Sequence, residues 1–297
     1  MGRVWLKNID YDKRILEIGP LHIPNISKDR AKNLFYADIR TTEEIISFYR
    51  NNPDVITENI VEIDYVIKNS YTESLNNIEK FDYVIATHVI EHIPRLISFF
   101  EDISNILNPN GKLCLAIPDK RYCFDHFRCP TSFAECYDIY TRGISNLPVR
   151  VLDHYISSTI NDPIILWKGN TSKYIARNKE RFRKAKENYL KSLNGEYIDV
   201  HFSVFTPETF LLFLFYMLNF NILPFKCIEF YGTEYYSNEF NCVLEFDKTV
   251  IANNSDEIEN ILNLLKKNKD DHINFNLINW ISGKTPKKFK FFLKKIF

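Results

Sequence analysis

Two apolar segments joined by an amphipathic stretch constrain this chain of 297 residues more than any other feature. Residues 81–88 are mostly apolar and end in a histidine, and residues 112–117 form a second apolar run. Between them, residues 94–107 have the period of a helix, and the Asn-Pro-Asn-Gly that follows is typical of a turn that ends a helix. The pattern predicts a βαβ unit, and its two strands should therefore be parallel.

An earlier predicted strand ends in a turn that favours glycine. Residues 14–18, with Glu17 among them, form a short apolar run, and Gly19 and Pro20 follow. Because Gly19 has no Cβ, its backbone can take a positive φ and a ligand can approach closely. A second apolar run ends at Asp38, about 20 positions later, and this spacing is typical of a Rossmann-type nucleotide site.

The glycine turn also excludes one ligand class. It has a single glycine followed by proline, not the GxGxxG pattern that cradles a pyrophosphate. An adenosyl ligand without phosphates therefore fits better than a dinucleotide. Residues 60–67 predict a third strand, with Asp64 in it or just beyond it. His88 ends the 81–88 strand, at the edge where open α/β sheets bind ligands.

Several stretches resemble one enzyme family. FDYVIATHVIEHI…LISFFEDISNILNPNGKLCLAIPD resembles the motif IV to motif VI core of class I S-adenosylmethionine (SAM) dependent methyltransferases, and Glu17-Ile18-Gly19 resembles their motif I. IPDKRYCFDHFR and DVHFSVFTPETF resemble a narrower group, the bacterial methyltransferases encoded with capsule and lipopolysaccharide sugar genes. The resemblance covers roughly residues 14–246. It implies a Rossmann-like α/β fold: a seven-stranded mixed sheet, mostly parallel with an antiparallel last strand, helices on both faces and an inserted helical lid.

The resemblance implies SAM as the cofactor. Asp38 is placed to accept hydrogen bonds from both ribose hydroxyls, and Asp64 resembles the contact to the adenine amino group. The expected cofactor-binding residues lie in or beside the first four predicted strands: Glu17, Gly19, Pro20, Asp38, Asp64 and His88.

Methyl transfer to oxygen needs an aligned hydroxyl and a group that takes its proton. We expect that group after the fifth strand or just before the helix at Thr206. His126 is preferred, because its loop carries two arginines that can hold an anionic acceptor, and His201 is its rival. The candidate catalytic residues are His126, His201, Asp119 and Asp125. The candidate substrate-binding residues are Arg121, Tyr122 and Arg128.

The chain divides into a predicted methyltransferase domain, residues 1–250, and a Lys/Phe-rich helical appendage, residues 251–297. Residues 121–200 form an insertion that we interpret as an acceptor-binding lid. Its basic stretch, residues 173–191, is either a solvated face or a surface that meets an anionic substrate. The last 15 residues, 283–297, hold six lysines among aromatic residues. They either pack on the domain or contact an anionic membrane surface or a partner.

Charge and cysteine usage exclude other classes. The net charge is zero and no N/D-P-P-Y/F motif lies near the fourth predicted strand, so no nucleic acid partner is expected. The chain shows no signal peptide, and its longest apolar run is shorter than the ~20 residues that span a bilayer, so a cytoplasmic location is expected. The six cysteines show no CxxC pair or zinc-finger spacing, which predicts reduced thiols and no metal site.

The resemblance therefore implies a SAM-dependent O-methyltransferase acting on a sugar, nucleotide-activated, in surface polysaccharide synthesis. Its substrate would be a small molecule. Two alternatives stay open: methylation of another capsule component, such as a phosphoramidate or a sugar amine, and a non-catalytic SAM-fold scaffold. The sequence leaves open the sugar, the hydroxyl and the oligomeric state, a homo-oligomer included.

Overall fold

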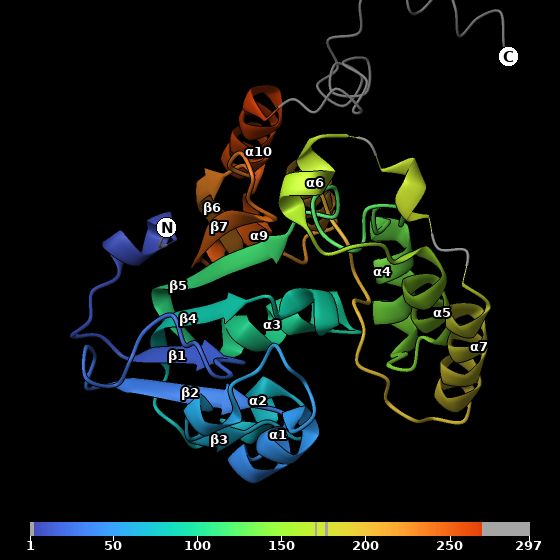
Figure 1. Ribbon diagram of the computed structural model, residues 1–297. Helices are drawn as coiled ribbons and strands as arrows, with labels where there is room; N and C mark the ends of the chain where they lie inside the picture. Colours follow the sequence, from blue (N-terminus) through green and yellow to red (C-terminus); the bar gives the residue numbers. More distant parts are fainter. Residues whose placement is uncertain (1–2, 170, 176–177, 269–297) are drawn as a thin grey trace, which may run out of the picture.

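A seven-stranded sheet forms the centre of the computed structural model, which describes residues 3–169, 171–175 and 178–268 (Figure 1). The strand order is β3-β2-β1-β4-β5-β7-β6. Strands β1 to β5 are parallel, and β7 runs antiparallel to both of its neighbours. This arrangement confirms the predicted mixed sheet with an antiparallel last strand. The strands are β1 (Ile15–Ile18), β2 (Leu34–Asp38), β3 (Tyr65–Val66), β4 (Phe81–Thr87), β5 (Leu107–Pro118), β6 (Phe225–Tyr231) and β7 (Glu239–Phe246).

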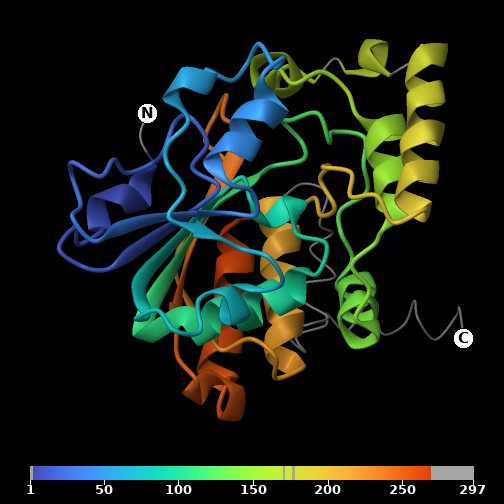
Figure 2. The same cartoon turned by 90° about the horizontal axis from the view of Figure 1, so that it is seen from below.

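Helices surround the sheet (Figure 2). The α-helices of the described residues are α1 (Thr42–Tyr49), α2 (Tyr71–Ser74), α3 (Leu96–Ile106), α4 (Phe133–Arg142), α5 (Pro148–Ser157), α6 (Pro163–Trp167), α7 (Lys179–Leu193), α8 (Pro207–Asn219), α9 (Thr249–Ala252) and α10 (Ser255–Lys267). Four 3₁₀ helices accompany them: η1 (Val4–Asn8), η2 (Thr57–Asn59), η3 (Ile90–His92) and η4 (Ser172–Tyr174).

The two faces of the sheet are covered differently. Side chains alternate along a strand, so Leu16 joins the larger core, which includes residues of α3, α8 and α10. Its neighbour Ile15 joins a smaller core with Trp5 of η1 and Ile26. Because residues 20–32 form turns and no α-helix, a 3₁₀ helix and a loop pack on this second face.

The helix predicted at Thr206 is confirmed as α8. Thr206 caps it, since its hydroxyl accepts from the backbone N–H of Thr209 and the Thr209 hydroxyl accepts from the N–H of Thr206. Pro207 occupies the first turn, where its missing N–H costs nothing. The helix is apolar nearly all round and is largely buried against the sheet.

Strand three differs from the prediction. It was expected over residues 60–67, but only Tyr65–Val66 pairs with β2. Asp64 precedes the strand and its carboxylate accepts from the backbone N–H of Tyr36. Most residues of the predicted strand therefore form the loop that precedes β3.

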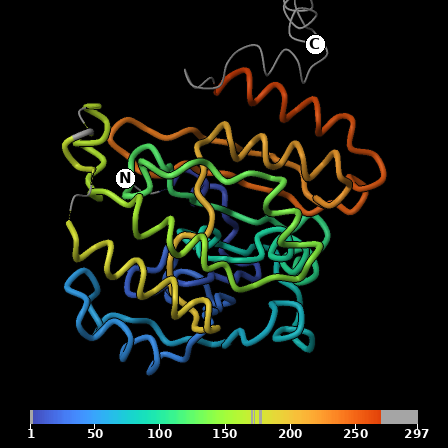
Figure 3. The backbone as a smooth tube through the Cα atoms, turned by 90° about the vertical axis from the view of Figure 1, so that its right-hand side faces the viewer, coloured from blue at the N-terminus to red at the C-terminus, as the bar shows by residue number. Residues whose placement is uncertain are grey.

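The segment between β5 and α8 is helical, as expected for the insertion. It includes α4 to α7, which lie to one side of the sheet, and α5 packs along α7 (Figures 1 and 3). A small core of its own holds Val151 beside Val200 and Phe202. On α7, Arg183 pairs with Glu180 and Glu187 of the same helix, and all three are exposed. Both acidic residues of α7 are thus paired within the helix with a single arginine, and the helix stays basic overall.

The cysteines and the C-terminal segment complete the description. All six cysteines are free thiols. Within the predicted appendage, α10 is an amphipathic helix that buries Ile261 and Leu265. The Lys/Phe-rich stretch at residues 283–297 lies outside the described residues. Among the described helices, none has both the length and the apolar character needed to cross a membrane.

Candidate functional site

A cavity of about 430 Å³ opens at the carboxyl ends of β1, β2 and β4. This is the edge where ligands bind in open α/β sheets. Four of the predicted cofactor-binding residues line it: Gly19, Pro20, Asp38 and His88. Apolar walls surround them, made by Ile18, Ile39, Ile45, Tyr71, Val89 and Ile93. The cavity therefore offers apolar surface with a few polar groups at its rim.

Gly19 lets the first turn approach the cavity closely. Its φ is +64°, a left-handed conformation that side chains disfavour. A Cβ at this position would lie 3.3 Å from Cγ2 of Val89, which lines the same cavity. The backbone N–H of Gly19 donates to the carbonyl of Ala37 at 2.9 Å, which ties the turn to the end of β2.

Asp38 ends β2 and faces the cavity. Its Oδ1 accepts from the backbone N–H of Arg40 at 3.0 Å. Burial raises the pKa of this carboxyl, with the hydrogen bond and charge of Arg40 acting in the opposite direction. The result is a carboxyl group that lies in a half-buried position at the end of a strand.

Glu17 is buried behind the first turn and does not line the cavity. Its carboxylate accepts from the backbone N–H groups of Asn25 and Ile26, at 2.7 and 3.2 Å. Burial raises the pKa of this group, and the hydrogen bonds from Asn25 lower it. Glu17 thus fixes the loop that follows the first turn, and this position does not support its expected place beside the ligand.

Asp64 also lies away from the cavity. It forms an ion pair with Lys28, whose Nζ lies 2.7 Å from Oδ1. Asp64 lies at the amino end of β3, whereas the cavity lies beyond the carboxyl ends of the strands. The adenine contact expected of Asp64 is therefore not supported by its placement.

His88 lines the cavity directly after β4, with a positive φ of 52°. Its Nε2 donates to Oε2 of Glu239 at 2.7 Å, and Arg3 pairs with the same oxygen at 2.9 Å. Burial would raise the pKa of Glu239, but His88 and Arg3 outweigh it and lower that pKa. The ring of His88 is therefore held by β7.

His92 and Asp199 line the cavity as a hydrogen-bonded pair. Nδ1 of His92 lies 2.8 Å from Oδ1 of Asp199. Burial acts to lower the pKa of His92, but the Asp199 hydrogen bond and the Glu91 charge raise it overall. Burial would raise the pKa of Asp199, but the hydrogen bond and charge of His92, together with the charge of Arg40, lower it overall. His92 was absent from the sequence-based candidates, since its only signal was the Glu-His pair within a family motif.

His201 is buried in a second pair. Its Nδ1 lies 2.5 Å from Oδ2 of Asp125. Arg128 pairs with Asp125 at 2.9 Å and with Asp153 at 2.8 Å, and it also donates to the carbonyl of His201. Burial would raise the pKa of Asp125, but His201 and Arg128 lower it to about 2. The side chain of Arg128 is fully buried and belongs to this network. Its position does not support the predicted contact with an acceptor.

The loop after β5 does not reach the cavity, although His126 was expected there. Lys120 donates its N–H to the carbonyl of Phe205, which draws the chain toward the start of α8. Nδ1 of His126 lies 2.6 Å from the carbonyl oxygen of Arg121. Asp119 is buried and bound by the Arg121 guanidinium at 2.6 Å. His126, Arg121 and Asp119 do not line the cavity. Their positions therefore do not support the catalytic and acceptor-binding roles expected of them.

Tyr122, another predicted acceptor contact, packs elsewhere. Its ring stacks on Trp167 of α6, with centroids 3.7 Å apart and planes 4° from parallel. Trp167 in turn donates its indole N–H to the carbonyl of Ser237 in the β6–β7 loop. The aromatic pair thus joins the insertion to the end of the sheet.

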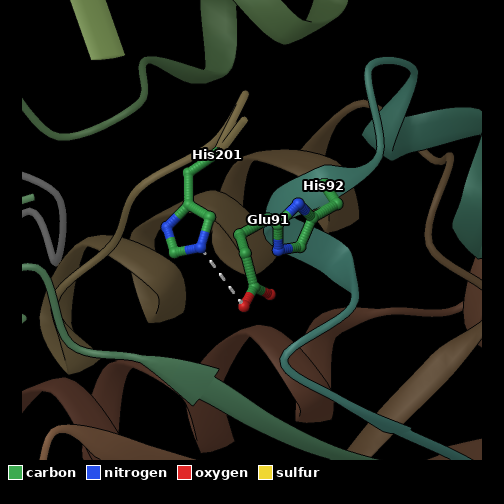
Figure 4. A group of neighbouring side chains, drawn as sticks. All are labelled: Glu91, His92 and His201. Carbon is green, nitrogen blue, oxygen red and sulfur yellow. Dashed lines mark ion pairs between the residues drawn. The ribbon is translucent and has the colours of Figure 1, made fainter. Parts of the chain in front are cut away.

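Glu91 lies beside both histidine pairs. Its carboxylate is buried, and Oε1 lies 3.9 Å from Nε2 of His201 (Figure 4). The rings of His92 and His201 meet edge to face, with centroids 4.7 Å apart. The backbone carbonyl of Glu91 accepts from Phe202 at 2.6 Å and from Ser203 at 3.2 Å. These backbone bonds bring residues after the insertion against η3.

Comparisons with known proteins concern both the sequence and the fold. A family model described as a methyltransferase domain matches residues 3–157. No curated protein matches the chain. Among solved structures, a SAM-dependent methyltransferase from Methanosarcina mazei is 16% identical, with a TM-score of 0.39 over 82% of this chain and 98% of that one. The trans-methyltransferase CalH, in complex with SAH, is 14% identical, with a TM-score of 0.37 over 80% of this chain and 52% of that one.

A third structure is titled as a putative Zn-dependent alcohol dehydrogenase from Rhodobacter sphaeroides. It is 11% identical, with a TM-score of 0.43 over 82% of this chain and 87% of that one. These likenesses are distant, and the family assignment rests on the family model.

Proposed function

Since this chain belongs to the methyltransferase-domain family and is a SAM-dependent enzyme, we propose that it methylates a hydroxyl group of a nucleotide-activated sugar in surface polysaccharide synthesis. The observation that carries the proposal is the cavity at the carboxyl ends of β1, β2 and β4. Its lining combines the glycine turn and the carboxyl of Asp38 with the pair formed by His92 and Asp199. The glycine turn and Asp38 suit a cofactor, and the His92–Asp199 pair suits an acceptor hydroxyl that must lose a proton.

The residues of the cavity fit SAM. Gly19 gives the backbone room for close approach, and Asp38 offers a carboxyl group to the ribose hydroxyls. The apolar side chains of Ile39, Ile45 and Tyr71 offer surface for the adenine ring. When bound, SAM supplies a methyl group on a positively charged sulfur; as an acceptor oxygen attacks the methyl carbon, the electron pair of the S–CH₃ bond returns to sulfur.

His92 holds the proton-accepting end of the proposed site. Because its Nδ1 hydrogen is directed to Asp199, its Nε2 keeps a lone pair that can accept a proton or bind a cation. Asp199 also fixes the orientation of the ring. The acceptor hydroxyl would bind near this nitrogen and lose its proton as the new C–O bond forms. We propose His92 in the place that the sequence predicted for His126.

The sugar acceptor rests on the resemblance of residues 117–128 and 199–210 to the sugar methyltransferases. Those stretches adjoin each other here, since Asp119 bridges to Phe205. They also supply Asp199, which reaches the cavity, and Asp125 and His201 of the buried pair. The narrower resemblance therefore falls on residues beside the proposed acceptor position.

A panel of acceptors tests the proposal. The purified enzyme is incubated with methyl-labelled SAM and with nucleotide sugars, free sugars, amino sugars and a sugar phosphoramidate, and His92→Ala serves as the blank. We expect label in a nucleotide sugar as an O-methyl ether. Label on nitrogen or on a phosphoramidate would replace the proposed acceptor with that class. Transfer to none of the sugars by an enzyme that binds SAM would refute the sugar acceptor.

A further inference from the structure

Three side chains that can bind a metal ion converge beside the cavity: Glu91, His92 and His201 (Figure 4). One carboxylate oxygen and one nitrogen from each ring lie within 4.8 Å of one another. We propose that these three residues bind a divalent transition-metal cation. The proposal replaces the expectation of no metal site, which rested on the cysteines alone.

The carboxylate of Glu91 lacks the partners that a buried charge requires. The residue is 1% exposed, and neither of its oxygens has a hydrogen-bond partner among the described residues. The ion-pair contacts of Glu91 in the described chain are histidine nitrogens, from His88 at 3.8 Å and from His201 at 3.9 Å. A buried carboxylate is costly unless it is paired or coordinates a metal. A cation beside Glu91 would supply that partner.

Both histidines are arranged as metal ligands usually are. A ligating histidine commonly donates its second ring N–H to a carboxylate, which fixes the tautomer and orients the ring. Here Nδ1 of His92 is bound to Asp199, and Nδ1 of His201 is bound to Asp125. Each ring therefore leaves Nε2 for a cation. Two histidine–carboxylate pairs lie beside a carboxylate that has no hydrogen-bond partner among the described residues. This combination distinguishes the cluster from a chance grouping of polar side chains.

The backbone holds the ligands on rigid elements. Glu91 and His92 belong to η3, directly after β4, and the Glu91 carbonyl accepts from the N–H groups of Phe202 and Ser203. His201 is thereby fixed next to them. Ligand atoms around a tetrahedral ion with bonds of about 2.1 Å lie about 3.4 Å apart, so the side chains would close by about 1 Å on binding.

The ligand set indicates the class of ion. Two imidazoles and one carboxylate suit Zn²⁺, Mn²⁺, Fe²⁺ or Co²⁺, whereas Mg²⁺ and Ca²⁺ prefer oxygen ligands. Of the three ligands only His92 lines the cavity, so an open coordination position would lie on that side. In the metal-bound state Nε2 of His92 would be a ligand and would take no proton; the ion would instead lower the pKa of a hydroxyl bound at the open position. This use of the ion rests on the proposed function, whereas binding of the ion does not.

Metal binding is measured without SAM or acceptor, so its outcome is independent of the proposed function. The full-length protein is treated with a chelator, desalted and titrated with Zn²⁺ and with Mn²⁺ by calorimetry, and bound metal is counted by mass spectrometry. We expect one ion per chain. Glu91→Gln should weaken binding by about 100-fold or more, and Asp199→Asn, which acts through His92, by about 10- to 100-fold. His126→Gln is the matched control and should bind like the wild type.

Thermal unfolding separates a metal ligand from a structural glutamate. In the metal-free state Glu91→Gln should be as stable as the wild type or more stable, because it removes a buried carboxylate that has no hydrogen-bond partner in the described part of the chain. Zn²⁺ should raise the Tm of the wild type and leave that of Glu91→Gln unchanged. If the wild type binds no ion, or if Glu91→Gln binds one equally well, the metal site is wrong. If Glu91→Gln fails to fold, metal binding by Asp199→Asn equal to that of the wild type would also contradict the proposed metal site.

Discussion

Nδ1 of His92 lies 2.8 Å from Oδ1 of Asp199, although 107 positions separate the two residues. His92 ends η3, just beyond β4, and Asp199 follows the inserted helices. The contact therefore joins the sheet to the insertion at the rim of the cavity. We propose that this pair, and not the loop after β5, provides the histidine that faces the acceptor.

Removal of the imidazole tests the role of His92. We expect His92→Ala to lower kcat by about 10²- to 10⁴-fold, the usual contribution of a group that assists proton transfer. SAM should still bind, because the glycine turn and Asp38 are untouched. The measurement is kcat with the acceptor identified in the panel, together with SAM affinity.

The matched variant for this test is His126→Ala. Its ring is bound to the Arg121 carbonyl and does not line the cavity, so its kcat should stay close to that of the wild type. An active His92→Ala enzyme beside an inactive His126→Ala enzyme would restore the assignment made from sequence.

Asp38 should contribute directly to SAM affinity. Asp38→Ala removes a carboxyl group from the cavity rim, and we expect the binding free energy to weaken by about 1.5–3 kcal/mol, the range for hydrogen bonds to a charged group. Asp64→Ala is the control, because its ion pair with Lys28 lies away from the cavity. Calorimetry showing equal affinity for Asp38→Ala and the wild type would move the ribose contact elsewhere.

Gly19 should matter for both backbone conformation and ligand approach. Gly19→Ala places a Cβ at φ +64° and 3.3 Å from Val89. Left-handed backbone costs other residues about 1–2 kcal/mol, and the new methyl group also crowds the cavity. Gly143, the C-cap of α4, has φ +65° with open space around it. Both alanine variants should lose stability in urea, but only Gly19→Ala should lose SAM affinity, and equal SAM affinities would contradict this view of the turn.

Local patterns predicted most of the fold. The apolar runs at β1, β2 and β4 and the capped helix α8 are encoded by neighbouring residues, so periodicity and cap chemistry were sufficient to find them. The length of β3 was overestimated, because an apolar run does not reveal how many of its residues pair with a neighbouring strand. Gly19 and Asp38 line the cavity because Gly19 directly follows β1 and Asp38 is the last residue of β2.

The polar residues of the site were harder to predict. The contacts of His92 with Asp199 and of Glu91 with His201 cross the whole insertion, and no local pattern encodes them. Arg128 illustrates a second difficulty, since a charged residue in a loop resembles a ligand contact until its burial is known. Its pairing with Asp125 and Asp153 assigns it to the interior.

The interior position of Arg128 gives a prediction about stability. Arg128→Met removes a buried cation, so that Asp153 loses its partner and Asp125 keeps only His201. Breaking a buried ion pair costs about 3–5 kcal/mol in the free energy of unfolding. Urea denaturation should show a loss of that order. Arg183→Met, on the exposed face of α7, should change stability by less than about 1 kcal/mol. Similar small losses in both variants would show that the Arg128 network is not a structural element.

The central claim is that the cavity at the ends of β1, β2 and β4 binds SAM. The most direct measurement is mass spectrometry of the small molecules released when freshly purified protein is denatured, followed by calorimetric titration of the emptied protein with SAM. We expect SAM or its demethylated product in the released fraction and one SAM bound per chain, with weaker binding by Asp38→Ala. A folded protein that releases neither compound and gives no heat with SAM would contradict it.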